Sequence, residues 1–509
     1  MVKYTPASEL RNQIFKTPFD ATLDPTNRWV QMEQIVPWDE MAAVLSKRMS
    51  HLGKGSVDLR YVLGAMLIKG LENLSDEDVL LQIQENIYMQ YFVGLRNWQK
   101  DQLFTPEVLV SVRKRLGEEG MSEMNDLILK ISQGQVIKHR APYGSRVNTQ
   151  DKAVQNRGIL KVDATVAPED IRYPTDTSLL NDARLFTEEF IDELFELIDE
   201  VKAKPRTYRR VAKQKYLRFS KRRRPGQKQI KTCKKQQLQY VRRNIGHIHK
   251  MLDTYERKNG IGLPNIRSKT YRSWLVVQHI YDQQNRMYTD KRKKIKDRIV
   301  SLQKPWVRPI VRGKAGKQVE FGSKLNVSET EGMLRVDQID FNNYNESKGL
   351  EGIVEGYKSL YSYYPEGVLV DKIYLTRENR KMLKERDIAH YGPQLGRQTE
   401  RTKAEKIKRK KKQNKRSEIE GKFGLAKMKF GLNRIMMKRS DTSKAHIQLI
   451  AISMNICKLW QIFWSFFGLL REIMAYQKLK WRIFHSGLLY FFQSAIYSSN
   501  MDELNPKLA

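Results

Sequence analysis

The chain has few cysteines, fewer acidic than basic residues, and no long apolar run. Its two cysteines, Cys233 and Cys457, stand far apart, which excludes a disulfide framework and a CxxC metal knuckle and favours a reducing cytoplasm. The first residues lack the apolar stretch of a secretory signal. The longest apolar run, residues 459–470, is shorter than the roughly 20 residues of a bilayer crossing. We therefore predict a buried helix in this run and no membrane protein.

The shortage of acidic residues makes the chain strongly basic. Lysine and arginine number 93 against 57 aspartates and glutamates, which gives a net charge of +36. A surplus of this size favours a polyanionic partner, and nucleic acid is the commonest one. Charge alone does not separate DNA from RNA or from an anionic membrane surface. The length of 509 residues predicts about two to four folded domains.

The first part of the chain, to about residue 135, has helical patterns. Helices are expected at residues 57–70 and 77–95, the second opened by Ser75, and from Thr105-Pro106 onward. Several short helices with basic residues on the last one fit a helix-turn-helix DNA-binding domain and a plain helical bundle equally well. The polar residues that follow predict a linker.

A mixed sheet with helices packed on it is expected after the linker, which is an α+β or mixed α/β fold. Strand-like runs begin at Ile159, and a hairpin is expected from residues 306–311 and 319–322. A long, helix-forming, basic segment interrupts this core, and its runs at 221–224 and 291–294 are predicted to be solvated faces more often than phosphate contacts. The predicted domains are a helical N-terminal DNA-binding domain (1–135), a linker (136–157), a core (158–442) with a helical insertion (182–300), and C-terminal helices (443–509).

Three acidic residues stand at positions that suit a hard-cation site. Asp163 and Asp371 each end a short β-like run, and Glu420 lies in a helical stretch. In that stretch an apolar stripe faces the core, formed by Ile419, Phe423, Ala426 and Phe430. Arg416, Glu420 and Lys427 form a second stripe, which nearby Glu418 does not join. An Arg-Glu pair four residues apart is common on helix surfaces, so this segment alone does not identify a site.

The spacing of the second stripe, R-x3-E-x6-K, is similar to the third-carboxylate signature of DDE-type bacterial insertion-sequence transposases of the insertion-sequence-five-like superfamily. Further blocks resemble the same family in the correct order, at residues 60–95, 113–120, 162–166, 171–176, 179–180, 308–314, 320–322, 370–374 and 445–455. Gln413 departs from the family pattern, which has a tyrosine three residues before the arginine. This departure bears on a DNA-positioning role of that tyrosine and not on the metal site.

The resemblance implies an RNase H-like catalytic core and a transposase that cuts at element ends and transfers strands. Asp163, Asp371 and Glu420 would be the catalytic residues and would bind Mg²⁺ or Mn²⁺, two ions in all, since oxygen donors suit such ions. The expected DNA contacts are Arg416, Lys427, Arg312 and Lys314. The expected partner is DNA, both element ends and target, with a homodimer in the active complex and a cytoplasmic, nucleoid-associated location.

Three other functions compete with this interpretation. They are a transposase-derived DNA-binding protein without catalysis, another RNase H-like nuclease such as a junction resolvase, and a basic RNA-binding scaffold. Some individual residues also have structural alternatives. Asp170, Asp176, Asp337 and Asp340 are expected to be caps or ion-pair partners, and His446, Trp460, Phe463, Trp464 and Phe467 are expected to lie in a core.

Overall fold

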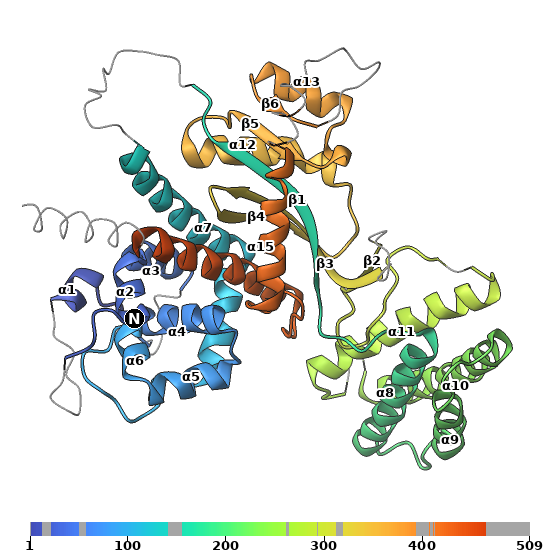
Figure 1. Ribbon diagram of the computed structural model, residues 1–509. Coiled ribbons are helices and arrows are strands. Elements are labelled where there is room, and N and C mark those ends of the chain that lie inside the picture. The colour runs from blue at the N-terminus through green and yellow to red at the C-terminus, as the bar shows by residue number, and fades with distance from the viewer. Residues whose placement is uncertain are drawn as a thin grey trace, which may run out of the picture.

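The computed structural model describes residues 2–12, 22–49, 57–140, 155–260, 264–292, 294–311, 319–392, 407, 411 and 413–464, with only the backbone for 133–140. This part of the chain contains N-terminal helices, a mixed sheet with helices on it, and a helical insertion (Figure 1). In Figure 1 the N-terminal helices (blue) and the insertion (green) lie well apart, with strand β1 and helix α15 between them.

The N-terminal helices follow the sequence signals, with one break that was not predicted. Their bounds are α1 Ala7–Arg11, α2 Arg28–Ile35, α3 Trp38–Ser46, α4 Leu59–Glu72, α5 Asp76–Glu85, α6 Ile87–Val93 and α7 Pro106–Arg140. The Ser75 hydroxyl caps α5 by accepting from the Asp78 amide, as expected. The single helix expected at 77–95 is two helices, because extended Asn86 ends α5 and its side chain caps α6. Helix α7 starts at Pro106 as predicted, kinks at Gly117, and reaches into the segment predicted as a linker.

The predicted mixed α/β class is confirmed by a sheet of parallel and antiparallel strands. The strands are β1 Ile159–Pro168, β2 Arg308–Val311, β3 Val319–Thr330, β4 Met333–Asp340, β5 Gly367–Val370 and β6 Ala389–His390. Their order is β2-β3-β1-β5-β6, with β4 also paired to β3. Strand β1 is antiparallel to β3 and parallel to β5, and β5 is parallel to β6.

The predicted hairpin is confirmed in the pairing of β2 with β3, although β3 is much longer than the run 319–322. The extension was missed because buried polar residues, among them Ser323 and Asn326, interrupt its apolar pattern. Gly322 is required near the end of this pairing, since a Cβ there would lie 2.0 Å from the carbonyl oxygen of Ala167 on β1. Close approach of β1 and β3 therefore depends on a glycine at this position.

Helices cover both faces of the sheet. On one face, Leu160 and Val162 of β1 pack with α12 (Leu350–Tyr361) and α13 (Arg377–Glu385). The other face packs against α15 (Ser417–Met428) and the C-terminal helix Ser440–Trp464. Because side chains alternate along a strand, Lys161 and Asp163 of β1 lie on the opposite face from Leu160 and Val162 and face α15. Two short 3₁₀ helices, η1 (Glu346–Gly349) and η2 (Lys372–Tyr374), flank these elements.

The C-terminal helix joins the N-terminal helices to the sheet. The Asn455 side chain accepts from the Leu334 amide of β4 at 2.8 Å and donates to the Leu334 carbonyl at 2.7 Å and to Asn125 of α7 at 2.8 Å. Trp460 and Phe463 pack against the N-terminal core, as expected, and the Trp460 indole donates to Gln31. Trp464 lies beside Phe463 at the helix end, and Phe467 is outside the described residues.

Among the described residues, one helix is long and apolar enough to span a membrane by length and composition. It is Ser440–Trp464, and 61% of its most apolar window is buried inside the protein. The helix includes residues 459–464 of the run predicted to be a buried helix, and residues 465–470 lie outside the described residues. Within the described part of that run Leu459 is buried, Gln461 is exposed, and the other residues are partly buried.

His446 lies in this helix, is 8% exposed, and was correctly expected in a core. Burial, together with the charges of Lys69 and Arg113, lowers its pKa from 6.5 to about 3. The unfolded chain takes up a proton as pH falls through 6.5, whereas the folded chain does so only near pH 3. Stability conferred by neutral His446 is therefore fully present above pH 6.5 and lost as pH falls toward 3, by about 1.4 kcal/mol per unit.

We expect His446→Leu to reduce the stability lost between pH 6.5 and pH 5 by about 2 kcal/mol relative to the unsubstituted protein. Urea unfolding of both proteins at the two pH values measures this difference. Buried Asp337, whose pKa is raised to about 6 by burial, works in the opposite direction because it stabilises the folded state as pH falls. Asp337 is present in both proteins, so its contribution to the pH dependence of stability cancels in the comparison. Equal losses in the two proteins would contradict the assignment to His446.

The insertion is a helical unit with its own core. Its helices are α8 Asp176–Leu197, α9 Arg209–Ser220, α10 Gln227–Asn259 and α11 Ser268–Thr289. Apolar residues of α8, α10 and α11 form one buried cluster, which includes Ile191, Val241 and Val277. Basic residues 221–224, between α9 and α10, are exposed, which fits both a solvated face and a phosphate contact.

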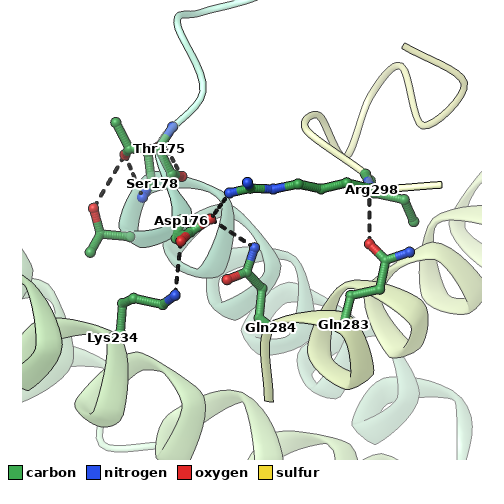
Figure 2. A network of polar contacts seen from close by, with 9 residues as sticks. Thr175, Asp176, Ser178, Lys234, Gln283, Gln284 and Arg298 are labelled. Carbon is green, nitrogen blue, oxygen red and sulfur yellow. Dashed lines mark hydrogen bonds and ion pairs between the residues drawn. The ribbon is translucent and has the colours of Figure 1, made fainter. Parts of the chain in front are cut away.

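Asp176 holds the start of the insertion together (Figure 2). Its carboxylate accepts from Lys234 of α10 at 2.8 Å, from Gln284 of α11 at 3.0 Å, and from Arg298 on the segment that returns to the sheet. Burial opposes ionisation of Asp176, but the Lys234 hydrogen bond and the Arg298 charge outweigh it and lower the pKa. The structural role expected for Asp176 is therefore confirmed.

The other competing acids also have structural partners. Asp337 pairs with Arg335 at 2.7 Å, Asp340 accepts from the Asn342 amide at 2.8 Å, and Asp170 pairs with Arg434 at 2.9 Å. These contacts agree with the caps and ion pairs expected for them.

Candidate active site

Asp163 lies on the face of β1 that α15 covers. Its side chain is 17% exposed, and its two oxygens have different partners. Oδ1 accepts from the Ala164 amide at 2.8 Å, and Oδ2 accepts from the Arg416 guanidinium at 3.0 Å. The acid is thus held in place by its own strand and by the residue that precedes α15.

Asp371 follows β5 and lies beside Asp163 in the sheet. Strands β1 and β5 are parallel, and Val162 is paired with Val370. Asp163 and Asp371 each follow these paired valines by one residue, so the register places the two acids at neighbouring positions. Asp371 is exposed and caps η2, accepting from the Lys372 amide at 2.7 Å.

Glu420 reaches the same region from α15. Its helix is anchored by Ile419 and Ala426, which are 0% and 3% exposed, and Phe430 just beyond the helix is also buried. Arg416 pairs with Glu420 at 3.2 Å while it pairs with Asp163, so one guanidinium bridges both carboxylates. Lys427 is in the last turn of the same helix and is partly buried.

The charges of the three acids interact. Burial raises the pKa of Asp163, the Ala164 N–H and the Arg416 charge lower it, and the negative charges of Glu420 and Asp371 raise it. The net shift of the Asp163 pKa is upward, and the Arg416 guanidinium is the cation that opposes it in the described conformation.

The chemistry of the acids fits a hard divalent cation, but their present arrangement is not a closed ligand set. Among the described residues, no group of three His, Cys, Asp or Glu side chains is gathered closely enough to hold a metal ion. Between Asp163 and Glu420 lies the Arg416 guanidinium. Carboxylate oxygens are suitable donors for Mg²⁺ or Mn²⁺, and an ion would supply the counter-charge that Arg416 provides here.

Two predicted DNA contacts, Arg312 and Lys314, lie outside the described residues. Sequence reasoning missed a residue that the structure places beside the acids. Lys161, two residues before Asp163 on β1, pairs with Glu418 of α15 at 2.6 Å. The available signal was the alternation of the strand, which puts residues 161 and 163 on one face.

Comparison with protein families identifies two regions of the chain. Residues 368–457 match the model of the Transposase DDE domain, and residues 17–115 match that of the Transposase domain (DUF772). In these two regions the chain is similar to DDE-type insertion-sequence transposases. The DDE match contains Asp371 and Glu420, whereas Asp163 lies before it. Transposases of this family act on DNA and generally use divalent metal ions.

A relative from Rhizobium meliloti, described as uncharacterized protein ORF8 in nfe locus, is 25% identical over 169 residues. The aligned region covers 33% of this chain and 75% of that protein. No solved structure matches the chain.

Proposed function

We propose that the protein is a DNA transposase that binds the ends of its own element, cuts there, and joins the 3′ ends to target DNA. The observation that carries this proposal is the position of Asp163 and Asp371, each one residue beyond the paired Val162 and Val370, with Arg416 bridging Asp163 to Glu420. The strand order β2-β3-β1-β5-β6, with β4 also paired to β3, is antiparallel on one side of β1 and parallel on the other, which supports an RNase H-like core.

In this proposal Asp163, Asp371 and Glu420 hold two Mg²⁺ or Mn²⁺ ions. When bound, such ions activate the attacking water or 3′-hydroxyl and stabilise the leaving oxygen. The chain orients the carboxylates: β1 and β5 fix the aspartates, and α15 brings Glu420 to them. Arg416 and Lys427 bind phosphates or bases of the element end, and Arg312 and Lys314 bind neighbouring phosphates. No covalent protein nucleophile is needed.

Element-end specificity is proposed for the N-terminal helices, with two copies of the chain in the active complex. A cytoplasmic location is typical of the family, and association with the nucleoid follows from the proposed DNA affinity.

The proposal is tested by incubating the full chain with DNA that carries the inverted repeats flanking its gene. We expect nicking at the repeat ends with Mg²⁺ or Mn²⁺ and none with EDTA. Binding without cleavage would favour a transposase-derived DNA-binding protein instead. Cleavage of branched DNA in preference to ends would favour a resolvase. Preference for RNA, unaffected by loss of the three carboxylates, would favour an RNA-binding scaffold.

The insertion is proposed to add salt-dependent affinity through the exposed residues 221–224. Deleting residues 200–300 is a poor test, because it would uncover Ile191 and Leu194 of α8 and remove Lys234 from Asp176. We expect substitution of Lys221, Arg222, Arg223 and Arg224 by glutamine to weaken end binding. The slope of log affinity against log salt should flatten by up to about 3 to 4, since each phosphate contact contributes about 0.9.

Titrations of end DNA at several salt concentrations measure this slope. The matched control replaces the three arginines by lysine, which keeps the charge and should keep the slope. An unchanged slope in the glutamine variant would show that this turn does not contact DNA.

A further inference from the structure

A buried lysine lies next to Asp163 on the face of β1 that α15 covers. Lys161 is 6% exposed and two residues before Asp163, so both side chains leave the strand on the same side. Its ammonium pairs with Glu329 at 2.5 Å and with Glu418 at 2.6 Å. Glu329 is directly opposite on β3, whereas Glu418 belongs to α15.

The two glutamates have different environments. Glu329 is 1% exposed and needs Lys161 as its counter-charge, because an unpaired buried carboxylate is costly. Glu418 is 56% exposed and would be solvated without the lysine. Burial of Lys161 favours its neutral form, but both glutamates outweigh burial and raise its pKa, so it stays charged. The bond to Glu418 is therefore not required for charge balance in the core, and its consequence is to tie α15 to β1.

A second ion pair joins β1 to α15, and in this pair the acid is on β1 and the base is at the start of α15. On β1 the base Lys161 faces an acid of α15, and the acid Asp163 faces the base Arg416. A shift of α15 along β1 that exchanged these partners would place Glu418 beside Asp163 and Arg416 beside Lys161. Like charges would then meet at both points, so the alternation selects one position of the helix.

We propose that Lys161, through Glu418, is a positioning residue that fixes α15 on β1 and so holds Glu420 beside Asp163. This inference rests on the proposed function of the three carboxylates. Arg416 cannot maintain the position alone, because both of its partners, Asp163 and Glu420, are proposed metal ligands. The pair Lys161–Glu418 uses neither ligand and keeps its contact when an ion replaces the Arg416 bridge.

The test is Glu418→Gln in the full chain, because Lys161→Met would leave Glu329 buried without a counter-charge. We expect the Mn²⁺ dissociation constant, measured by electron paramagnetic resonance, and the Mn²⁺ concentration for half-maximal end cleavage both to rise about tenfold, as for other residues that orient ligands. Tm and end binding in EDTA should not change, since Glu418 is mostly exposed. Glu418→Asp, which keeps the charge, should restore part of the affinity.

Glu351→Gln is the matched control. Glu351 is 60% exposed, pairs with Arg386 on the other face of the sheet, and should leave Mn²⁺ binding unchanged. If the unsubstituted chain binds Mn²⁺ and cleaves, but Glu418→Gln has the same Mn²⁺ affinity, the positioning role is wrong and the proposed function stands. If the unsubstituted chain neither binds Mn²⁺ nor cleaves, the proposed function fails, and the positioning role fails with it.

Discussion

Asp163→Asn, Asp371→Asn and Glu420→Gln are each expected to lower metal-dependent cleavage of element ends by about 1,000-fold or more. Each change removes one charged oxygen donor from the proposed metal site, and a thousandfold loss corresponds to about 4 kcal/mol of lost transition-state stabilisation. Each substitution keeps the size of the side chain. Asn at position 163 can still accept the Ala164 hydrogen bond, so the strand should be undisturbed.

End binding in EDTA, measured by fluorescence anisotropy, should stay within a few-fold of the unsubstituted protein for all three variants. Asp340→Asn is the matched control: it is an aspartate in the same sheet that only caps the Asn342 amide, and it should cleave normally. Normal cleavage by any one of the three variants would remove that residue from the assignment. Loss of end binding together with cleavage would instead indicate a folding defect.

The parts of this site that depend on local pattern could be predicted from sequence. Short β-like runs marked Asp163 and Asp371, and the apolar stripe of Ile419 and Ala426 oriented the helix that carries Glu420. The position of Asp163 at a strand end was wrong, because β1 continues to Pro168. In each case the signal lies within about ten residues, because the period of a strand or helix is a local property.

Pairings across long sequence distances could not be predicted. Lys161 and Glu418 are 257 residues apart, and only the fold brings them together. Asp176 was expected to have a structural role, but its partners Lys234 and Arg298 follow it by 58 and 122 residues. A buried charged residue is expected to have a partner of opposite charge, but the sequence does not show which residue that partner is.

Buried polar residues caused the errors in the limits of elements. The extension of β3 was overlooked because Ser323 and Asn326 are fully buried in it, where apolar residues are the usual signal. The Asn326 carbonyl oxygen accepts a hydrogen bond from the Tyr374 hydroxyl at 2.6 Å, which satisfies that buried oxygen. The break at Asn86 has a related cause, since the partly buried Asn86 side chain supplies the cap of α6 where α5 ends.

A buried ion pair in the N-terminal helices gives the second large expected effect. Glu33 of α2 and Arg60 of α4 are both 0% exposed, and their side chains are paired at 3.4 Å. The Arg60 guanidinium also lies over the Trp38 ring, 3.2 Å from its centroid. Burial lowers the pKa of Arg60 to about 9, and the Glu33 charge opposes that shift. Both residues lie within the matched Transposase domain (DUF772), so this pair supports the region proposed to recognise element ends.

We expect Glu33→Gln to lower the free energy of unfolding by about 3 to 5 kcal/mol, because it leaves the Arg60 charge buried without its carboxylate. The paired replacement Glu33→Leu with Arg60→Met should recover much of this loss, since apolar groups of similar volume need no counter-charge. Urea unfolding of the full chain, followed by tryptophan fluorescence, measures both changes, and Glu9→Gln on the exposed side of α1 is the control. A loss below about 1 kcal/mol for Glu33→Gln would mean that water or another group already neutralises Arg60. End binding should fall with stability in Glu33→Gln and return in the double variant, because the pair acts on the fold of the N-terminal helices and not on DNA directly.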